Sequence, residues 1–170
     1  DYCLRRNFTC PQIIVAGGFT RFHSVRNALD KVPDGAIVAV HDGVRPLVTS
    51  RLVRDMFEKA ETVQSLVPVI PCTDTLKVLQ KEGEELKTVE GVVADRSMLY
   101  AAQTPQIFHS EMLKSAYSLA YDTMFTDDAS VMQKYGKSLS YMIGERLNIK
   151  ITTQEDLLLA EAVMSLRSKS

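Results

Sequence analysis

The sequence of 170 residues has no tryptophan, and its three cysteines, Cys3, Cys10 and Cys72, lack the spacing of a metal motif. An odd number of cysteines argues against a disulfide framework and favours a reducing compartment. No run approaches the ~18 apolar residues that a membrane span needs, and no stretch has the pattern of a signal peptide. The sequence therefore predicts a cytoplasmic protein that does not interact with membranes.

Charge of one sign is also scarce, because 20 Lys and Arg residues face 21 Asp and Glu residues, for a formal net charge of −1. Without a basic tract, the chain is not expected to bind nucleic acid. Apolar residues make up 45% and charged residues 24%, as in ordinary globular proteins. The chain begins at Asp1 in what reads as the middle of an element. We predict that residues 1–170 are a single domain that is N-terminally incomplete.

Continuous apolar runs alternate with helical patterns in the first part of the chain. Residues 12–16, 36–40 and 66–70 are short apolar runs typical of buried strands, and apolar side chains recur at helical spacing between them. This order and the lack of strict alternation predict an α/β fold with a mostly parallel sheet that helices cover on both faces.

The middle of the chain has a different pattern. Residues 75–80 alternate, residues 81–84 read as a hairpin tip, and residues 86–92 return, which predicts an antiparallel β-arm over about residues 73–93. The remaining pattern predicts helices at 112–120, at about 128–136 and from Thr153 to 166, with strands at 139–143 and 149–152.

Polar residues follow the expected strands, where ligands bind in open α/β sheets. These segments are Gly17-Gly18 with Thr20, Arg21 and Ser24; His41-Asp42-Gly43 with Arg45; Thr73-Asp74-Thr75 with Lys77; and Asn148-Ile149-Lys150. Asp42 suits a Mg²⁺ ion that also binds phosphate oxygens, or it caps a helix or forms a turn. Arg45 suits phosphate or carboxylate binding, or it forms an ion pair with Asp42.

The other candidates also have a plain structural alternative. Gly17-Gly18 lets a ligand approach backbone N–H groups, or forms a tight turn between strand and helix. Residues 126–129 are a candidate helix N-cap, Arg96 a candidate surface ion pair, and His41 a packed histidine. We find no Ser–His–Asp, Cys–His or paired-carboxylate set. Phosphate binders with one carboxylate indicate phosphoryl or nucleotidyl transfer, in which the protein positions groups and neutralises charge.

Seven segments in order resemble the 2-C-methyl-D-erythritol 4-phosphate cytidylyltransferase family of isoprenoid precursor synthesis. They are GGFTRFHSV (17–25), VHDGVRP (40–46), DTLK (74–77), ADR (94–96), QTPQIF (103–108), TDDAS (126–130) and NIKITTQEDL (148–157). The resemblance implies a Rossmann-like fold and a homodimer whose β-arms complete each other's sites. It also implies transfer of CMP from CTP to a polyol phosphate with Mg²⁺.

The resemblance also implies a role for each matching residue. Gly17, Gly18, Arg21 and Ser24 would bind CTP, and Asp42 would hold the metal. The acceptor would lie against a set of residues comprising Arg45, Thr104, Thr126 and Lys150, together with Thr75 and Arg96 from the partner's arm. Arg96 and Lys150 would be catalytic, because they would orient the attacking phosphate.

Two features depart from the family pattern. No segment matches the family's N-terminal Gly-rich loop, so the chain as given is expected to turn over poorly. Phe19 follows Gly17-Gly18, where family members often carry a polar residue. Two alternatives remain open: a ribitol-5-phosphate cytidylyltransferase, and a catalytically dead dimeric binding fragment.

Overall fold

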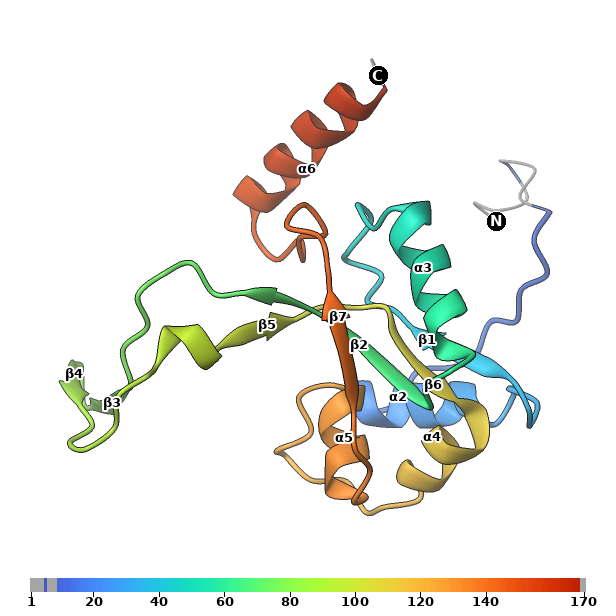
Figure 1. Cartoon of the computed structure of the whole chain (residues 1–170), viewed down its shortest axis with the longest axis horizontal. Helices are drawn as coiled ribbons and strands as arrows, with labels where there is room; N and C mark the ends of the chain where they lie inside the picture. The colour runs from blue at the N-terminus through green and yellow to red at the C-terminus, as the bar shows by residue number, and fades with distance from the viewer. Residues whose placement is uncertain (1–4, 6–8, 169–170) are drawn as a thin grey trace.

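The apolar runs form the centre of a β-sheet in the computed structural model, which describes residue 5 and residues 9–168 (Figure 1). Within residues 9–168 the sheet has five strands: β1 (Ile37–Val40), β2 (Ser65–Pro71), β5 (Tyr100–Ala102), β6 (Gln106–His109) and β7 (Ser140–Ile143). β2 and β7 pair in parallel, while β6 is antiparallel to both β1 and β2, and β5 is antiparallel to β2. β1, β2 and β7 thus run in one direction.

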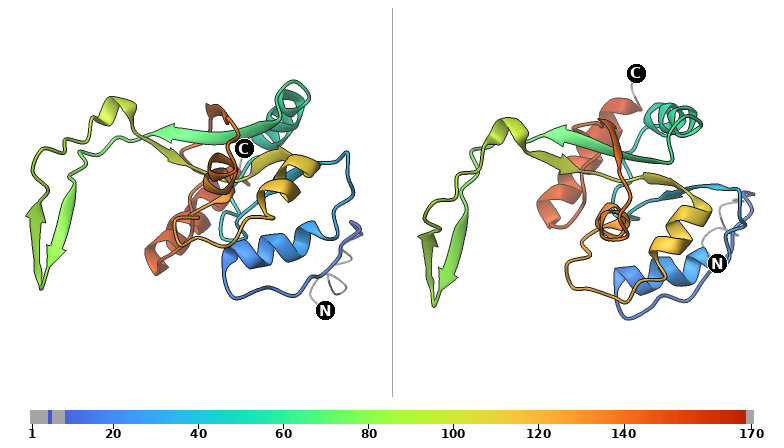
Figure 2. Two further views of the ribbon diagram at one scale, coloured as in Figure 1. Left: turned by 90° about the horizontal axis from the view of Figure 1, so that it is seen from below. Right: turned by 60° about the horizontal axis from the view of Figure 1, so that its bottom comes forward.

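Helices cover both faces of this sheet, as the views in Figure 2 show. On one face lie α2 (Arg21–Leu29), α4 (Ser110–Ala116) and α5 (Asp128–Lys134), and on the other lies α3 (Ser50–Ala60). Neighbouring strand residues serve opposite faces: Phe108 packs with Phe22 and Leu113, whereas Ile107 packs with Met56. The predicted α/β class is therefore confirmed.

Side-chain caps begin the helices close to the predicted positions. Asp127 caps α5 and Thr153 caps α6 (Gln154–Arg167), each in a capping box. At α3 the cap is Thr49, whose hydroxyl accepts from Leu52 N at 3.1 Å and donates to Glu145. No helix among the described residues is long and apolar enough to cross a membrane.

Two predicted strands are wrong. Residues 12–16, which lie in the described part of the chain, have no ladder partner there, and Ile14 is 91% exposed. An apolar run without a neighbouring strand has nowhere to place its backbone hydrogen bonds. Residues 149–152 form a loop in which Ile151 N donates to Val44 O, and the side chains of Ile149 and Ile151 pack under α6 with Leu47.

β5 and β6 were not expected from the sequence. Gln103, Thr104 and Pro105 interrupt residues 100–109, so neither apolar run reaches the length of a typical strand. The pairing of β6 between β1 and β2 is a long-range feature that no local pattern indicates.

The predicted antiparallel arm is confirmed. β3 (Leu79–Glu82) and β4 (Glu85–Thr88) form a separate two-stranded sheet, with Gly83 in the left-handed region at φ 63° as the turn requires. In Figures 1 and 2 the hairpin projects away from the main sheet. Its apolar side chains Leu79 and Leu86 are exposed, so the arm has an apolar surface available for a partner.

Candidate active site

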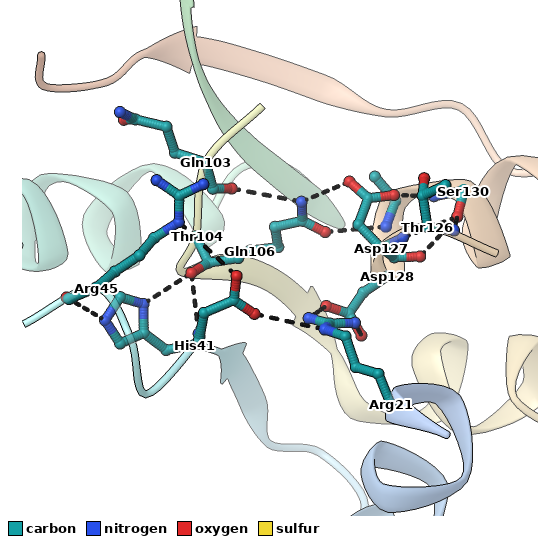
Figure 3. A network of polar contacts seen from close by, with 12 residues as sticks. Arg21, His41, Arg45, Gln103, Thr104, Gln106, Thr126, Asp127, Asp128 and Ser130 are labelled. Carbon is teal, nitrogen blue, oxygen red and sulfur yellow. Dashed lines mark hydrogen bonds and ion pairs between the residues drawn. The ribbon is translucent and has the colours of Figure 1, made fainter. Parts of the chain in front are cut away.

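Segments from distant parts of the sequence meet at one edge of the sheet. The carboxyl ends of β1 and β7 lie there with the chain that enters β6 and the start of α5 (Figure 3). A cavity of about 130 Å³ opens between them and is lined by Arg21, Asp42, Arg45, Ala102, Gln103, Thr104, Gln106, Thr126, Asp127 and Lys150. The cavity thus brings together the predicted metal ligand, Arg21 and the four acceptor residues predicted on the body of the same chain.

Asp42 lies among cationic side chains. Its Oδ2 is 3.2 Å from Lys150 Nζ and 3.8 Å from Arg45 Nε, and its Oδ1 is 3.4 Å from Arg21 Nε. Burial alone would raise the pKa of Asp42, but the hydrogen bond from Lys150 and the charge of Arg21 hold it below its ordinary value. Asp42 is therefore ionised at neutral pH, and the three cations that line the cavity outnumber its two carboxylates, Asp42 and Asp127, and favour an anionic ligand.

The backbone at Asp42 is fixed by Thr104 and His41. Asp42 N donates to Thr104 Oγ1 at 3.0 Å, and Thr104 Oγ1 lies 3.0 Å from His41 Nδ1. His41 Nε2 lies 3.0 Å from the carbonyl oxygen of Arg45, which can only accept, so Nε2 carries the hydrogen. In the neutral ring, Nδ1 then accepts the hydroxyl hydrogen of Thr104. His41 is thus a hydrogen-bonded residue that orients Thr104, as the structural alternative predicts, but its side chain is exposed and not packed.

The loop that carries Lys150 is held by side-chain amides. Gln103 accepts from Glu145 N at 3.1 Å and donates to Glu145 O at 2.8 Å, and Asn148 donates to Thr104 O at 2.8 Å. A side chain at Gly144 would collide with Gln103. Gln103 and Glu145 were missed by sequence reasoning, because they pair with each other and Glu145 also accepts from Thr49, across more than 40 positions in the sequence.

Arg45 joins the same loop to the cavity. Its Nη1 donates to Asn148 O at 2.7 Å, while Arg45 Nε is buried without a hydrogen-bond partner in the described part of the chain. Burial lowers the pKa of Arg45, and the charge of Asp42 opposes that effect. A buried N–H group without a partner, 3.8 Å from Asp42, is suited to bind an incoming anion.

The start of α5 reaches the cavity through Thr126 and Asp127. Gln106 is buried on β6, donates to Asp127 Oδ2 at 2.8 Å and accepts from Ala129 N at 2.9 Å. Asp127 is also the N-cap of α5. The capping role weighed for this segment is therefore confirmed, and the same residues line the cavity.

Arg21 points from α2 toward this cavity. Its Nη1 and Nη2 donate to the two oxygens of Asp128 at 3.0 and 2.7 Å, and Asp128 also accepts from the hydroxyl of Tyr117. Burial alone would lower the pKa of Arg21, but the hydrogen bonds and charge of Asp128 raise it overall. Asp128 and Tyr117 have no counterpart among the sequence-predicted site residues, since nothing in the sequence pairs them with Arg21.

The glycines form a separate group at the start of α2. Gly18 N donates to Ser24 Oγ at 3.0 Å, and a side chain at Gly18 would collide with His23. The turn therefore requires glycine for space. Gly17, Gly18 and Ser24 are not among the residues that line the 130 Å³ cavity.

Thr75 and Arg96 also lie outside that cavity. Arg96 begins the short 3₁₀ helix η1 (Arg96–Met98) at the base of the arm, where its Nη1 donates to Thr73 O at 3.0 Å. Between this base and the polar cavity lies a larger, mainly apolar cavity of about 710 Å³, to which β5, β7 and α5 contribute. The fold places Thr75 and Arg96 away from Asp42 of their own chain.

The donors around Asp42 fit magnesium better than a transition metal. The described residues contain no group of three or more His, Cys, Asp and Glu side chains that could hold a metal ion. Two carboxylates line the cavity, and the oxygens of Asp127 already accept hydrogen bonds from Gln106 and Ser130 N, which leaves Asp42 as the candidate ligand. A site with few carboxylates and no protein cage suits Mg²⁺, which takes its other ligands from water and phosphate.

An α/β sheet with a carboxylate, basic side chains and hydroxyls at its edge defines a class of proteins that bind phosphate-bearing ligands at strand ends. The family model of 2-C-methyl-D-erythritol 4-phosphate cytidylyltransferase matches residues 5–166, and the chain belongs to this family.

Relatives and solved structures agree with this assignment. The enzyme of that name from Porphyromonas gingivalis is 41% identical over 166 residues, which cover 97% of this chain and 72% of the relative. The one from Bacillus cereus is 38% identical over 161 residues, covering 94% and 69%. The crystal structure of the Thermus thermophilus enzyme superposes with a TM-score of 0.76 at 34% identity and covers 90% of this chain and 73% of that one.

Proposed function

We propose that this protein transfers CMP from CTP to 2-C-methyl-D-erythritol 4-phosphate and releases pyrophosphate. The observation that carries the proposal is the position of Asp42 in a cavity with Arg45 and Lys150. The attacking group is a phosphate oxygen that is already anionic, so the reaction needs no general base. Its barrier comes largely from repulsion between two phosphates, which positioned cations reduce.

In this proposal Lys150 and Arg45 bind the phosphate of the acceptor, and Thr104 and Thr126 contact the same ligand. Asp42 would hold Mg²⁺, which would neutralise charge on the triphosphate. Gly17, Gly18 and Ser24 contact the nucleotide at the start of α2, and Arg21 supports that side of the cavity. For Asp42, Lys150, Arg45, Thr104, Thr126 and Arg21 the assignment is supported by their position in the cavity, whereas the assignment of Gly17, Gly18 and Ser24 is supported by the family resemblance of their segment.

We further propose that the active form is a homodimer in which Thr75 and Arg96 act in the partner's site. Both residues lie at the base of the arm and away from the cavity of their own chain, and the arm exposes apolar side chains such as Leu79 and Leu86. A hairpin of this kind gains stability by packing on another surface. A cytoplasmic location is proposed from the scarcity of cysteine, of which Cys10 and Cys72 are free thiols and Cys3 lies outside the described residues.

Pyrophosphate release by the full-length protein tests the proposed reaction. The protein is given CTP and Mg²⁺ with either 2-C-methyl-D-erythritol 4-phosphate or ribitol 5-phosphate. Release with the first acceptor alone is the expected result. Release with the second alone would keep the mechanism and change the acceptor, and no release with either from a folded protein would favour a binding role.

A further inference from the structure

Asp128 is a buried carboxylate to which the proposed reaction assigns no role. It is the first residue of α5 and is fully buried. Arg21 of α2 and Tyr117, which follows α4, both donate to it. A buried charge is costly unless it is paired and hydrogen-bonded, and here the guanidinium of Arg21 supplies a bidentate partner.

The pairing determines which atoms of Arg21 face Asp42. Both Nη atoms are engaged by Asp128, so Arg21 approaches Asp42 Oδ1 through Nε, at 3.4 Å. If Asp128 did not bind Arg21, both Nη atoms of the guanidinium would be free to form hydrogen bonds. The carboxylate nearest to them in the cavity is Asp42, which could then accept two hydrogen bonds from Arg21. A bidentate Arg21–Asp42 pair would occupy the oxygens that a divalent cation needs.

The charges around Asp42 also indicate that the pairing of Arg21 with Asp128 favours binding of a cation. Asp128 neutralises Arg21 from behind, whereas Arg45 and Lys150 form ion pairs with Asp42 and with no second carboxylate in the described part of the chain. Without the charge of Asp128, Arg21 would add a full positive charge at 3.4 Å from Asp42 and would repel a metal cation there.

We propose that Asp128 is a positioning residue that holds both Nη atoms of Arg21 and thereby limits the contact of Arg21 with Asp42 to one long hydrogen bond through Nε, so that a divalent cation does not compete with a bidentate pair for Asp42. The inference rests on the proposed metal role of Asp42. Tyr117 supports the orientation of Asp128 but does not contribute charge.

Calorimetric titration with CTP, in excess Mg²⁺ and in EDTA, tests this role. Asp128→Asn keeps the shape of the side chain and removes its charge. We expect the gain in CTP affinity that Mg²⁺ provides to fall about tenfold, the value of one charge-assisted interaction, while CTP affinity in EDTA should not fall, because the unneutralised charge of Arg21 attracts the triphosphate. Mg²⁺ activation of pyrophosphate release should shift to higher concentration by a similar factor.

Two further variants separate positioning from a merely structural role. Tyr117→Phe removes a hydrogen bond at the same buried carboxylate but leaves the Arg21 pair, so it should lower the melting temperature without changing the Mg²⁺-dependent gain. In Asp128→Asn with Arg21→Gln, the competing guanidinium is absent, and the gain should return to within about threefold of the wild type. A purely structural role predicts that the double variant is no better than Asp128→Asn.

The failure of this inference differs from the failure of the proposed function. If the CTP affinity of the wild-type protein does not depend on Mg²⁺, the proposed metal role of Asp42 itself is wrong. A wild type that depends on Mg²⁺, together with an Asp128→Asn variant that keeps the full gain, would overturn only the role of Asp128. If Asp128→Asn does not fold, the variant Asp128→Asn with Arg21→Gln is the test. A loss of the Mg²⁺-dependent gain in CTP affinity in that double variant would contradict the proposal.

Discussion

The Lys150 ammonium group lies 3.2 Å from Asp42 Oδ2, and Arg45 Nε lies 3.8 Å from the same oxygen. Lys150 comes from the loop after β7 and Asp42 from the end of β1, so the sheet joins two short motifs that are far apart in sequence. Lys150 is still 47% exposed and can move toward a ligand, whereas the Asp42 side chain is 14% exposed. The carboxylate is thus the fixed group and the lysine the adaptable one.

Lys150→Ala is expected to slow turnover by about 10²–10³-fold, because one positioned charge-assisted contact is worth about 2.7–4 kcal/mol in the transition state. The fold should be kept, since the side chain is half exposed and its loop is held by Gln103 and Asn148. Steady-state kinetics and a melting curve check both points. Lys59→Ala, on the exposed side of α3, is the matched control. A Lys150→Ala enzyme with the turnover of the control would contradict the assigned role.

Asp42→Asn should weaken the dependence of CTP binding on Mg²⁺ and also change stability in acid. The pKa of Asp42 is below its ordinary value of 3.8, so the ionised form stabilises the fold above pH 3.8, and this contribution is lost as the pH falls through the lowered pKa. Unfolding by urea between pH 5 and pH 2 should therefore show a smaller loss of stability in Asp42→Asn than in the wild type. Equal losses in the two proteins would mean that Asp42 is not stabilised by its neighbours.

Local signals predicted much of this fold. Apolar runs located β1 and β2, hydroxyl and carboxyl caps located the starts of α5 and α6, and alternation around Gly83 located the arm. These local signals failed where pairing with a distant segment determines whether a strand forms. Residues 12–16 have the composition of a strand but lack a neighbour among the described residues, and β6 is a strand because β1 and β2 pair with it on both sides.

The residues of the candidate site also fall into those that local patterns predict and those that only the tertiary structure reveals. Asp42 and Arg45 could be predicted because charged residues that closely follow an apolar run are unusual and lie at the edge where ligands bind. Lys150 could be predicted only from the resemblance of residues 148–157 to the family, since it lay inside the strand expected at 149–152. The residues that position them could not, since Gln103 pairs with the backbone of Glu145, Glu145 accepts from Thr49, and Asp128 pairs with Arg21, and such distant partners have no spacing rule in the sequence.

The core on the α2, α4 and α5 face depends strongly on Phe108. Its ring is fully buried and packs with Phe22 and Leu113. Phe108→Ala should cost about 3–5 kcal/mol of unfolding free energy, which lowers the melting temperature by roughly 10 °C or more. Met124→Ala, at a side chain that is largely exposed, should change stability by less than about 0.5 kcal/mol. Denaturant unfolding of the two variants measures the difference, and similar midpoints would contradict the packing described for Phe108.

The shared site of the proposed homodimer makes a specific prediction about mixed subunits. Each site would take Lys150 from one chain and Arg96 from the other, so Lys150→Ala and Arg96→Ala homodimers should both be nearly inactive. A heterodimer of the two variants has one site in which both residues are intact and one in which both are lost. Because the two sites of a twofold dimer are equivalent, this heterodimer should regain about half of the wild-type activity per dimer.

Co-expression with two different affinity tags isolates such heterodimers for the assay. The matched control is the heterodimer of Lys150→Ala and Asp42→Asn, whose residues lie 3.2 Å apart on the same body in the wild type. There each site keeps one defect, so no activity should return. Recovery in the first heterodimer and not in the control requires that Arg96 acts across the interface. If neither heterodimer recovers, Arg96 acts within its own chain, and the arm must then fold back toward its own cavity on substrate binding.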